Sequence, residues 1–296
     1  MPQLDELKEG LAALRSANKE WFMAGVVVYW IGLPVLALQF VSIAKKIIPF
    51  WLTLKVQIAG LFVSKLLPSS LGTLTLNTYY LTQRKHTIHQ AASVMAMNGI
   101  TSGIAYFTLI ILALAATTAS AEGPFSDKRL ILWVVAGMAI VLLLLYLLAR
   151  TRVVRKIMQE KFGSVVESIA EYKSNRRGVL RAILLNGIGS VTSNFALYAS
   201  AQAVGMDITL PQAFLAYTFG NVAAALVPTP GGLGATEAGL YGAFVLMGFD
   251  TSSSMAAVLL YRLISFWIPT IPGYMAFWSL RKDVLANFSF KANKAA

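Results

Sequence analysis

The chain has 296 residues, of which 57% are hydrophobic and 13% are charged, and its formal net charge is +12. The charged share is about half that of an ordinary soluble domain, which excludes a soluble fold. The chain has no cysteine and only two histidines, His86 and His89, which excludes a disulfide framework and a Cys- or His-rich metal site.

Five long apolar segments predict helices that cross a membrane. About 20 apolar residues span the hydrocarbon core of a bilayer. The five segments are, in chain order, 21–44, 90–118, 130–149, 180–204 and 254–280. Residues 1–20, which precede them, carry acids at amphipathic spacing, so they do not have the pattern of a secretory signal peptide.

Two further apolar segments, 50–82 and 212–249, are interrupted near their middles. The first is interrupted by "PSSLG" at 68–72 and the second by "PTPGGLG" at 228–234. Each half has about a dozen residues or a little more, which is too short to cross a bilayer alone. We therefore predict two re-entrant hairpins, in which a helix enters the membrane, breaks and returns on the same side.

Lysine and arginine are distributed unevenly among the connections. Of the 25 basic residues, 17 fall in segments 45–49, 83–89, 150–181 and the tail after 280, which the positive-inside rule places in the cytoplasm. The run 150–181 has apolar residues at helical spacing, which predicts an amphipathic helix on an anionic lipid surface rather than a nucleic-acid-binding arm. These residues are Val154, Met158, Val165 and Ile169.

The two interrupted segments lie at corresponding places in two halves of the chain. Residues 21–118 and 180–282 each contain a span, a hairpin and a span, offset by about 160 residues and joined by 119–179. The basic connections place the first hairpin on the cytoplasmic side and the second on the outer side. This inverted repeat is typical of transporters, whose sites lie near the midplane where broken helices meet. The alternative is a duplication retained for folding alone.

The glycine-rich break at 228–234 is the first candidate site. Irregular backbone is tolerated at membrane depth only where it faces protein or a water-filled cavity. Glycines permit tight turns, and the N-terminus of the helix that begins near Ala235 attracts negative charge. These features predict an anion site for a headgroup phosphate. The alternative is a tight structural turn.

Four ionisable residues lie within apolar segments, where such residues are functional candidates: Lys55, Lys65, Glu237 and Arg262. We predict that Glu237 and Arg262 pair around the break, either for binding or for structure alone. Lys65 is either a second cation for the phosphate or a residue that snorkels to the interface, and snorkelling is the prediction for Lys55. The predicted binding set is Lys65, Ser69, Gly72, Pro230, Gly231, Gly232, Gly234, Glu237 and Arg262.

Small polar residues form stripes at helical spacing on two of the spans. They either pack helices together or line a hydrated lipid path. The stripes are Asn98 and Thr101 on one span, and Asn186, Ser190, Ser193 and Asn194 on the other. The chain contains no nucleophile–base–acid set, metal-ligand spacing or nucleotide phosphate loop, so we expect neither an enzyme nor a cofactor.

Two motifs carry a resemblance to a known family. "LVPTPGGLGATEAGL" and "AAVLLYRLISFWIPTIPG" resemble the signature of the lysylphosphatidylglycerol synthase transmembrane, flippase-like family. "LPSSLGTLTLNTYYL" and "SVMAMNGIT" resemble its upstream repeat, and the resemblance covers residues 4 to 282. It implies a membrane domain that moves lipid between leaflets, and Pro230, Gly231, Gly232, Gly234, Glu237 and Arg262 match its motif.

The chain departs from the family pattern in several places. The family's first repeat usually has an acid and an Arg–Asp pair where this chain has Thr73, Asn98 and Thr101, which implies an asymmetric site or a different lipid. Members usually open with one more span. The best-known members also carry an aminoacyl transferase domain, an activity that we do not expect of a chain ending shortly after its last span.

The sequence thus predicts an all-α polytopic protein of the cytoplasmic membrane of a prokaryote. It has about five full spans and two re-entrant hairpins in an inverted repeat. We expect it to bind and translocate an anionic phospholipid or lipid-linked headgroup without nucleotide hydrolysis. The alternatives are a non-transporting scaffold that presents lipid to a separate transferase, and a small-solute secondary transporter.

Overall fold

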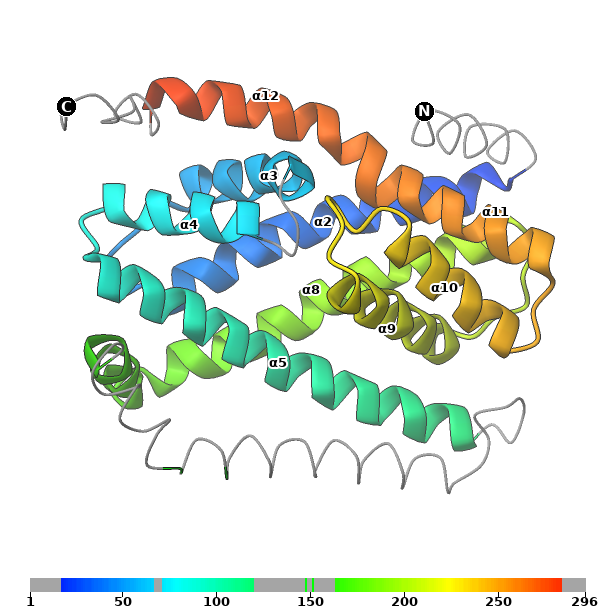
Figure 1. Cartoon of the computed structure of the whole chain (residues 1–296), viewed down its shortest axis with the longest axis horizontal. Coiled ribbons are helices and arrows are strands. Elements are labelled where there is room, and N and C mark those ends of the chain that lie inside the picture. Colours follow the sequence, from blue (N-terminus) through cyan, green and yellow to red (C-terminus); the bar gives the residue numbers. More distant parts are fainter. Residues whose placement is uncertain (1–16, 67–70, 120–146, 148–150, 152–162, 284–296) are drawn as a thin grey trace.

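The structure, a computed structural model, describes residues 17–66, 71–119, 147, 151 and 163–283 (Figure 1). Every regular element within these ranges is a helix, which confirms the all-α prediction. The elements are α2 (Lys19–Ile43), α3 (Phe50–Leu66), α4 (Leu71–Gln83), α5 (Ile88–Ala119), η1 (Glu171–Lys173), α8 (Arg176–Ala203), α9 (Leu210–Leu226), α10 (Ala235–Leu246), α11 (Thr251–Arg262), η2 (Leu263–Trp267) and α12 (Ile268–Asp283). A further helical stretch covers 163–170.

The outer surface is apolar along whole faces of the long helices. On α2, Met23, Val27 and Ile31 are all more than half exposed and stand four residues apart, on one face of the helix. On α5 and α8 exposed apolar residues recur at the same helical spacing: Ile100, Ile104, Phe107 and Ile111, and Leu180, Leu184, Ile188 and Val191. Polar residues such as Gln39, Asn77 and Asn194 are buried instead. Apolar outside and polar inside is the pattern of a protein whose solvent is lipid.

Three helices are long and apolar enough to cross a membrane: Lys19–Ile43, Ile88–Thr117 and Thr251–Leu280. They correspond to three of the five predicted spans. The predicted span 180–204 is also one long helix, α8, whose 28 residues extend for about 42 Å. Its hydropathy is lowered by a polar stripe that includes Asn186 and Asn194, both of which are buried. The predicted span 130–149 lies almost entirely outside the described residues.

Both interrupted segments form pairs of helices, as the prolines and glycines predict. Helices α9 and α10 pack against each other and are joined by the break at 227–234. Helices α3 and α4 also pack against each other, and their inner ends are Leu66 and Leu71. Figure 1 shows the two pairs entering from opposite ends of the molecule, with their tips pointing toward its middle. The re-entrant membrane topology and the inverted repeat stay predictions.

Helix ends are fixed by side chains at both ends of the molecule. At one end Thr209 and Gln212 form a capping box that starts α9, and Asp250 caps α11. At the other end Lys45 pairs with Glu171 at 2.8 Å, and the Tyr172 hydroxyl donates to the carbonyl of Ile43 at 2.6 Å. The described part of the predicted amphipathic segment is thus tied to the end of α2.

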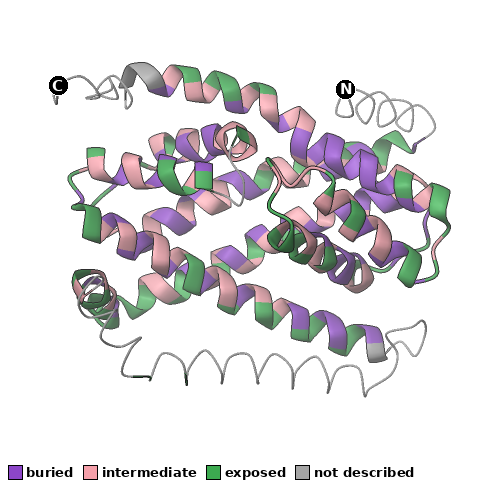
Figure 2. Ribbon diagram, viewed as in Figure 1, coloured by how far each residue is buried: buried purple, intermediate pink, exposed green. Residues whose placement is uncertain are grey.

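The interior consists of two apolar clusters, and each combines residues from both halves of the chain. The larger surrounds α11, where Ala257, Val258 and Leu260 are fully buried, and Figure 2 shows the C-terminal half of this helix buried. The smaller lies between the inner faces of α3, α4 and α5 and includes Val56 and Tyr80. Two polar cavities lie beside these clusters, and they are described below.

Candidate functional site

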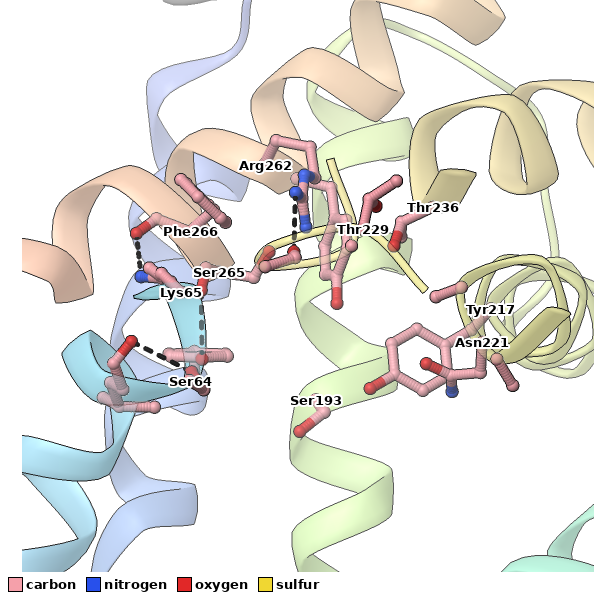
Figure 3. A pocket seen from close by; sticks show the side chains of 17 residues that line it. Ser64, Lys65, Ser193, Tyr217, Asn221, Thr229, Thr236, Arg262, Ser265 and Phe266 are labelled. Carbon is pink, nitrogen blue, oxygen red and sulfur yellow. Dashed lines mark hydrogen bonds between the residues drawn. The ribbon is translucent and has the colours of Figure 1, made fainter. Parts of the chain in front are cut away.

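A cavity of about 530 Å³ lies where the tips of the two helix pairs approach each other (Figure 3). Its walls come from α2, α3, α8, α9, the break at 227–234, α10, α11 and η2. The described residues that line it include two cations and many hydroxyls, but no aspartate or glutamate. They are Tyr29, Leu61, Ser64, Lys65, Ser193, Tyr217, Asn221, Ala224, Ala225, Thr229, Gly231, Gly232, Thr236, Tyr261, Arg262, Ser265 and Phe266.

Arg262 fixes one wall of this cavity. Its guanidinium Nε forms an ion pair with Glu237 Oε1, and Nη2 donates to the carbonyl oxygen of Gly231 at 3.3 Å. The two charged side chains are 9% and 12% exposed, so the pair is nearly buried. Glu237 lies in the first turn of α10, where a carboxylate also stabilises the helix. The predicted pair is therefore present, and it ties α11 to the break.

Lys65, at the end of α3, reaches across to the other half of the chain. Its ammonium donates to the carbonyl oxygen of Phe266 and to Thr270 Oγ1, the latter at 2.8 Å. The Phe266 ring lies between the two cations, 4.5 Å from Lys65 Nζ and 4.6 Å from Arg262 Cζ. Lys65 points into the protein, so the alternative of snorkelling does not describe it (Figure 3).

A π-helical turn, η2, forms one wall of the cavity, and its carbonyl groups accept hydrogen bonds from α2 and α3. In such a turn the hydrogen bonds run from residue i to i+5, and single π turns are frequent at functional sites. The carbonyl of Phe266 accepts from Lys65, and that of Ser265 accepts from the hydroxyl of Tyr29 at 3.3 Å. Tyr29 and Lys65 thus join α2 and α3 to this wall.

The glycines of the break adopt a backbone that L residues avoid. The φ angles of Gly231, Gly232 and Gly234 are 64°, 69° and 79°. A Cβ on Gly231 would lie 2.5 Å from the ring of Phe266, and one on Gly232 would lie 2.6 Å from Thr236 Oγ1. Gly234 has open space around it. Gly231 is therefore required both for the turn and for the contact with η2.

A sequence profile described as "Lysylphosphatidylglycerol synthase TM region" matches residues 6–273. The chain belongs to this family. Among curated proteins, none matches the chain. The family and the apolar helices together make it an integral membrane protein.

The lysylphosphatidylglycerol synthase TM fold brings most of the predicted set to one place. Lys65, Gly231, Gly232 and Arg262 line the cavity, and Glu237 stands behind Arg262. The rest lie elsewhere. Pro230 shapes the break by accepting from Leu233 N at 3.4 Å, Gly234 starts α10, and Gly72 packs against the backbone of Val63. Ser69 lies outside the described residues.

The backbone donors of the break are used partly within the break itself. Gly232 N donates to the carbonyl of Thr229 and Thr236 N to that of Gly232, each at 3.0 Å. The backbone contribution to the predicted anion site is thus smaller than expected, because the N–H groups of Gly232, Leu233 and Thr236 are all engaged. The cations and hydroxyls around it provide the remaining donors.

The tyrosine hydroxyl groups of the cavity were not predicted from the sequence. Tyr29, Tyr217 and Tyr261 come from three helices and face one cavity, but in the sequence each is a single aromatic residue in an apolar run. The one signal that they share is their position: tyrosines at the membrane interface lie near the ends of spans, whereas these three lie further in. Ser193 is the one lining residue of α8, and it belongs to the polar stripe noted above.

The arrangement has the chemistry of an anion site. The Arg262–Glu237 pair is neutral as a whole, so Lys65 gives the lining its net positive charge. No acidic side chain in the described part of the chain pairs with Lys65. Lysine is a common point-charge ligand of phosphate, and charge-assisted hydrogen bonds are roughly twice as strong as neutral ones. An oxyanion bound here would meet one uncompensated cation and several hydroxyl donors.

Proposed function

We propose that the chain binds the anionic headgroup of a membrane lipid in the cationic cavity and carries it between leaflets. The observation that supports this most is the cavity of about 530 Å³ itself, with Lys65 and Arg262 in its walls and no acid among its described lining residues. A net positive, hydroxyl-rich cavity inside a lipid-facing helical protein is suited to a phosphate group.

The charge of the lining favours an anion over a zwitterion. A zwitterionic headgroup brings a cation that would need an acid in the wall, and the acid nearest the cavity, Glu237, is already paired with Arg262. An anionic headgroup has no such requirement. We therefore propose phosphate-bearing lipids without a cationic group as the substrate class.

The positions of the helix tips favour exchange between leaflets over binding alone. Both helix pairs end near the middle of the molecule, one from each end, and Gly231 packs on Phe266 and near the backbone of Lys65. In transporters built from inverted repeats, such broken helices meet at a midplane site that opens to each side in turn. We propose that the two pairs are re-entrant and that the chain uses no nucleotide. The membrane is the cytoplasmic membrane of a prokaryote.

The lipids that remain bound through purification test the binding part of this proposal. In native mass spectrometry of the full chain, anionic phospholipids should be enriched over their share of the source membrane. The Lys65→Met variant should lose the enrichment. Equal retention of anionic and zwitterionic lipids by the wild type would contradict an anion site. Binding without any leaflet exchange would favour the scaffold that presents lipid to a separate transferase.

A further inference from the structure

A second cavity, of about 380 Å³, lies in the other half of the molecule and differs in chemistry from the cationic one. It is enclosed by α2, α3, α4, α5 and α8. Five of its lining side chains are amides: Gln39, Gln57, Asn77, Asn98 and Asn186. Its other lining residues are Leu36, Phe40, Thr73, Leu74, Met95, Gly99 and Ser102, so no ionisable group is among those described. We call it the amide cavity.

Hydrogen bonds hold three of the amides in place: Gln57, Asn77 and Asn186. Gln57 Nε2 donates to Asn77 Oδ1 at 3.0 Å, and Asn77 Nδ2 donates to the carbonyl of Thr73 at 2.9 Å. On the opposite wall Ser102 donates to Asn186 Oδ1 at 2.9 Å. These bonds orient polar groups on both sides of the cavity before any ligand arrives, which is what a preorganised site requires.

Gln39 does not take part in this network. Its side chain is 0% exposed and lines the cavity, yet within the described residues neither Nε2 nor Oε1 has a hydrogen-bond partner. Buried polar groups in folded proteins are almost always satisfied, and each exception needs a cause. An amide carries both donors and acceptors, so the missing partner has to supply both as well.

We propose that the amide cavity is a second ligand site, which binds an uncharged, hydroxyl-rich group such as the sugar of a glycolipid. A hydroxyl donates and accepts at once, as the amide of Gln39 requires. A charged group would be buried here without a counter-charge. The cavity volume lies in the range of small-molecule sites, and apolar Leu36, Phe40 and Met95 complete the walls.

The position of the amide cavity relates it to the cationic one. Asn186 lines the amide cavity and Ser193 lines the cationic cavity, and both residues belong to α8. Their separation of seven residues corresponds to about 10 Å along the helix. The site goes beyond the anion site proposed above, because it recognises different chemistry. A headgroup that carries both a phosphate and a sugar has the size to reach both cavities.

Binding to the full chain in phosphatidylcholine nanodiscs tests the site. The probes are dioctanoyl glucosyl-diacylglycerol, dioctanoylglycerol without the sugar, and free methyl glucoside. The wild type should bind the glucosyl lipid more tightly than the sugar-free one. Gln39→Leu should weaken glucosyl-lipid binding by about tenfold, the effect of one lost hydrogen bond and an unmatched hydroxyl. Binding of methyl glucoside with the same dependence on Gln39 shows recognition of the sugar alone. If the glucosyl lipid binds and methyl glucoside does not, the acyl chains contribute to binding as well.

The same variant separates a ligand site from a structural glutamine. Removing a buried amide that has no partner should leave the melting temperature of the ligand-free protein unchanged or higher. Asn98→Leu, at the half-buried mouth of the cavity, is a second variant that should weaken the same probe. Equal affinities of the wild type and both variants, or of the lipids with and without sugar, would show that only water fills the cavity.

The anion site and the amide cavity can fail independently. Lys65→Met should leave glucosyl-lipid affinity within about twofold and should weaken phosphatidic acid. A wild type that binds the glucosyl lipid but not phosphatidic acid supports the amide cavity while it contradicts the anion site.

Discussion

Arg262 and Glu237 form a nearly buried ion pair that joins the end of α11 to the first turn of α10. The guanidinium also donates to the carbonyl of Gly231 and stacks on the ring of Phe266. One arginine thus holds together the break, the π-helical turn and the helix that follows the break.

The pair should respond non-additively to mutation. Removing one partner leaves a charge buried without compensation, so Arg262→Met or Glu237→Met should each lower the free energy of unfolding by about 3–5 kcal/mol. The double variant should lose clearly less than the sum, as measured by thermal unfolding in detergent. A strictly additive result would show that the charges do not interact. An exchanged pair should recover only part of the loss, because a carboxylate at position 262 cannot donate to Gly231.

Lys65 should determine the preference for anionic lipid. Lys65→Met removes the uncompensated cation of the cavity and a charge-assisted contact, so affinity for phosphatidic acid should fall by about tenfold or more. Affinity for phosphatidylcholine should change little. Lys55→Met is the matched control, since it removes the same charge from the same helix and does not line the cavity. Equal effects of the two variants in a lipid-binding titration would contradict a role for Lys65 in the site.

The glycines of the break should differ in what they tolerate. Gly234→Ala meets no clash but has to hold an alanine at φ 79° and ψ −50°, which costs about 1–3 kcal/mol in thermal unfolding, and lipid binding should persist. Gly231→Ala adds a clash with the Phe266 ring and should lower both stability and lipid affinity further. The additional change Phe266→Leu should recover part of the stability. Equal losses at the two glycines would mean that the contact with η2 is unimportant.

His86, between α4 and α5 and outside the spans, should make stability depend on pH. Burial lowers the pKa of its imidazole below the ordinary 6.5, and its Nε2 accepts from the Lys46 backbone N–H at 3.2 Å. As pH falls below 6.5, the unfolded chain binds the proton first, so this contribution to stability is complete above 6.5 and is lost on acidification. The melting temperature should fall less steeply between about pH 7 and pH 5 in His86→Leu than in the wild type. Parallel curves would contradict this.

The orientation of the chain is open to a labelling test, because the sequence has no cysteine. Ser252→Cys lies in the first turn of α11, at the very start of the last span, and Ser174→Cys lies in the basic connection; both positions are exposed. In intact cells a membrane-impermeant maleimide should label position 252 and should not label 174 until the cells are opened. The reverse pattern would contradict the assignment of the basic connections to the cytoplasm.

The sequence predicts those features of the site that depend on local pattern and on charge. The break at 228–234 follows from its prolines and glycines. The Arg262–Glu237 pair follows from the rarity of charge in apolar segments, because each is the most suitable partner for the other. The spans 21–44, 90–118 and 254–280 follow from length and hydropathy alone. The span 180–204 was predicted in the same way and forms the long helix α8, although buried Asn186 and Asn194 lower its hydropathy.

Features that depend on packing between distant segments could not be predicted. Lys65 donates to the carbonyl of Phe266 in η2, 201 residues away, and nothing in "LISFW" signals a π turn. Tyr29 and Ser265 are 236 residues apart and meet only in the folded chain. Gln39 is an ordinary polar residue in a span until the structure shows that it is fully buried and without a partner.

The central claim is that anionic lipid crosses between leaflets through the cationic cavity, and leaflet exchange in proteoliposomes tests it most directly. The vesicles would contain tail-labelled phosphatidic acid or tail-labelled phosphatidylcholine, and exchange would be followed by chemical quenching of the outer leaflet. We expect the wild type to exchange phosphatidic acid well above the rate of protein-free vesicles, Lys55→Met to match it, and Lys65→Met to fall toward the protein-free rate. A wild type that moves neither lipid faster than protein-free vesicles would contradict the claim.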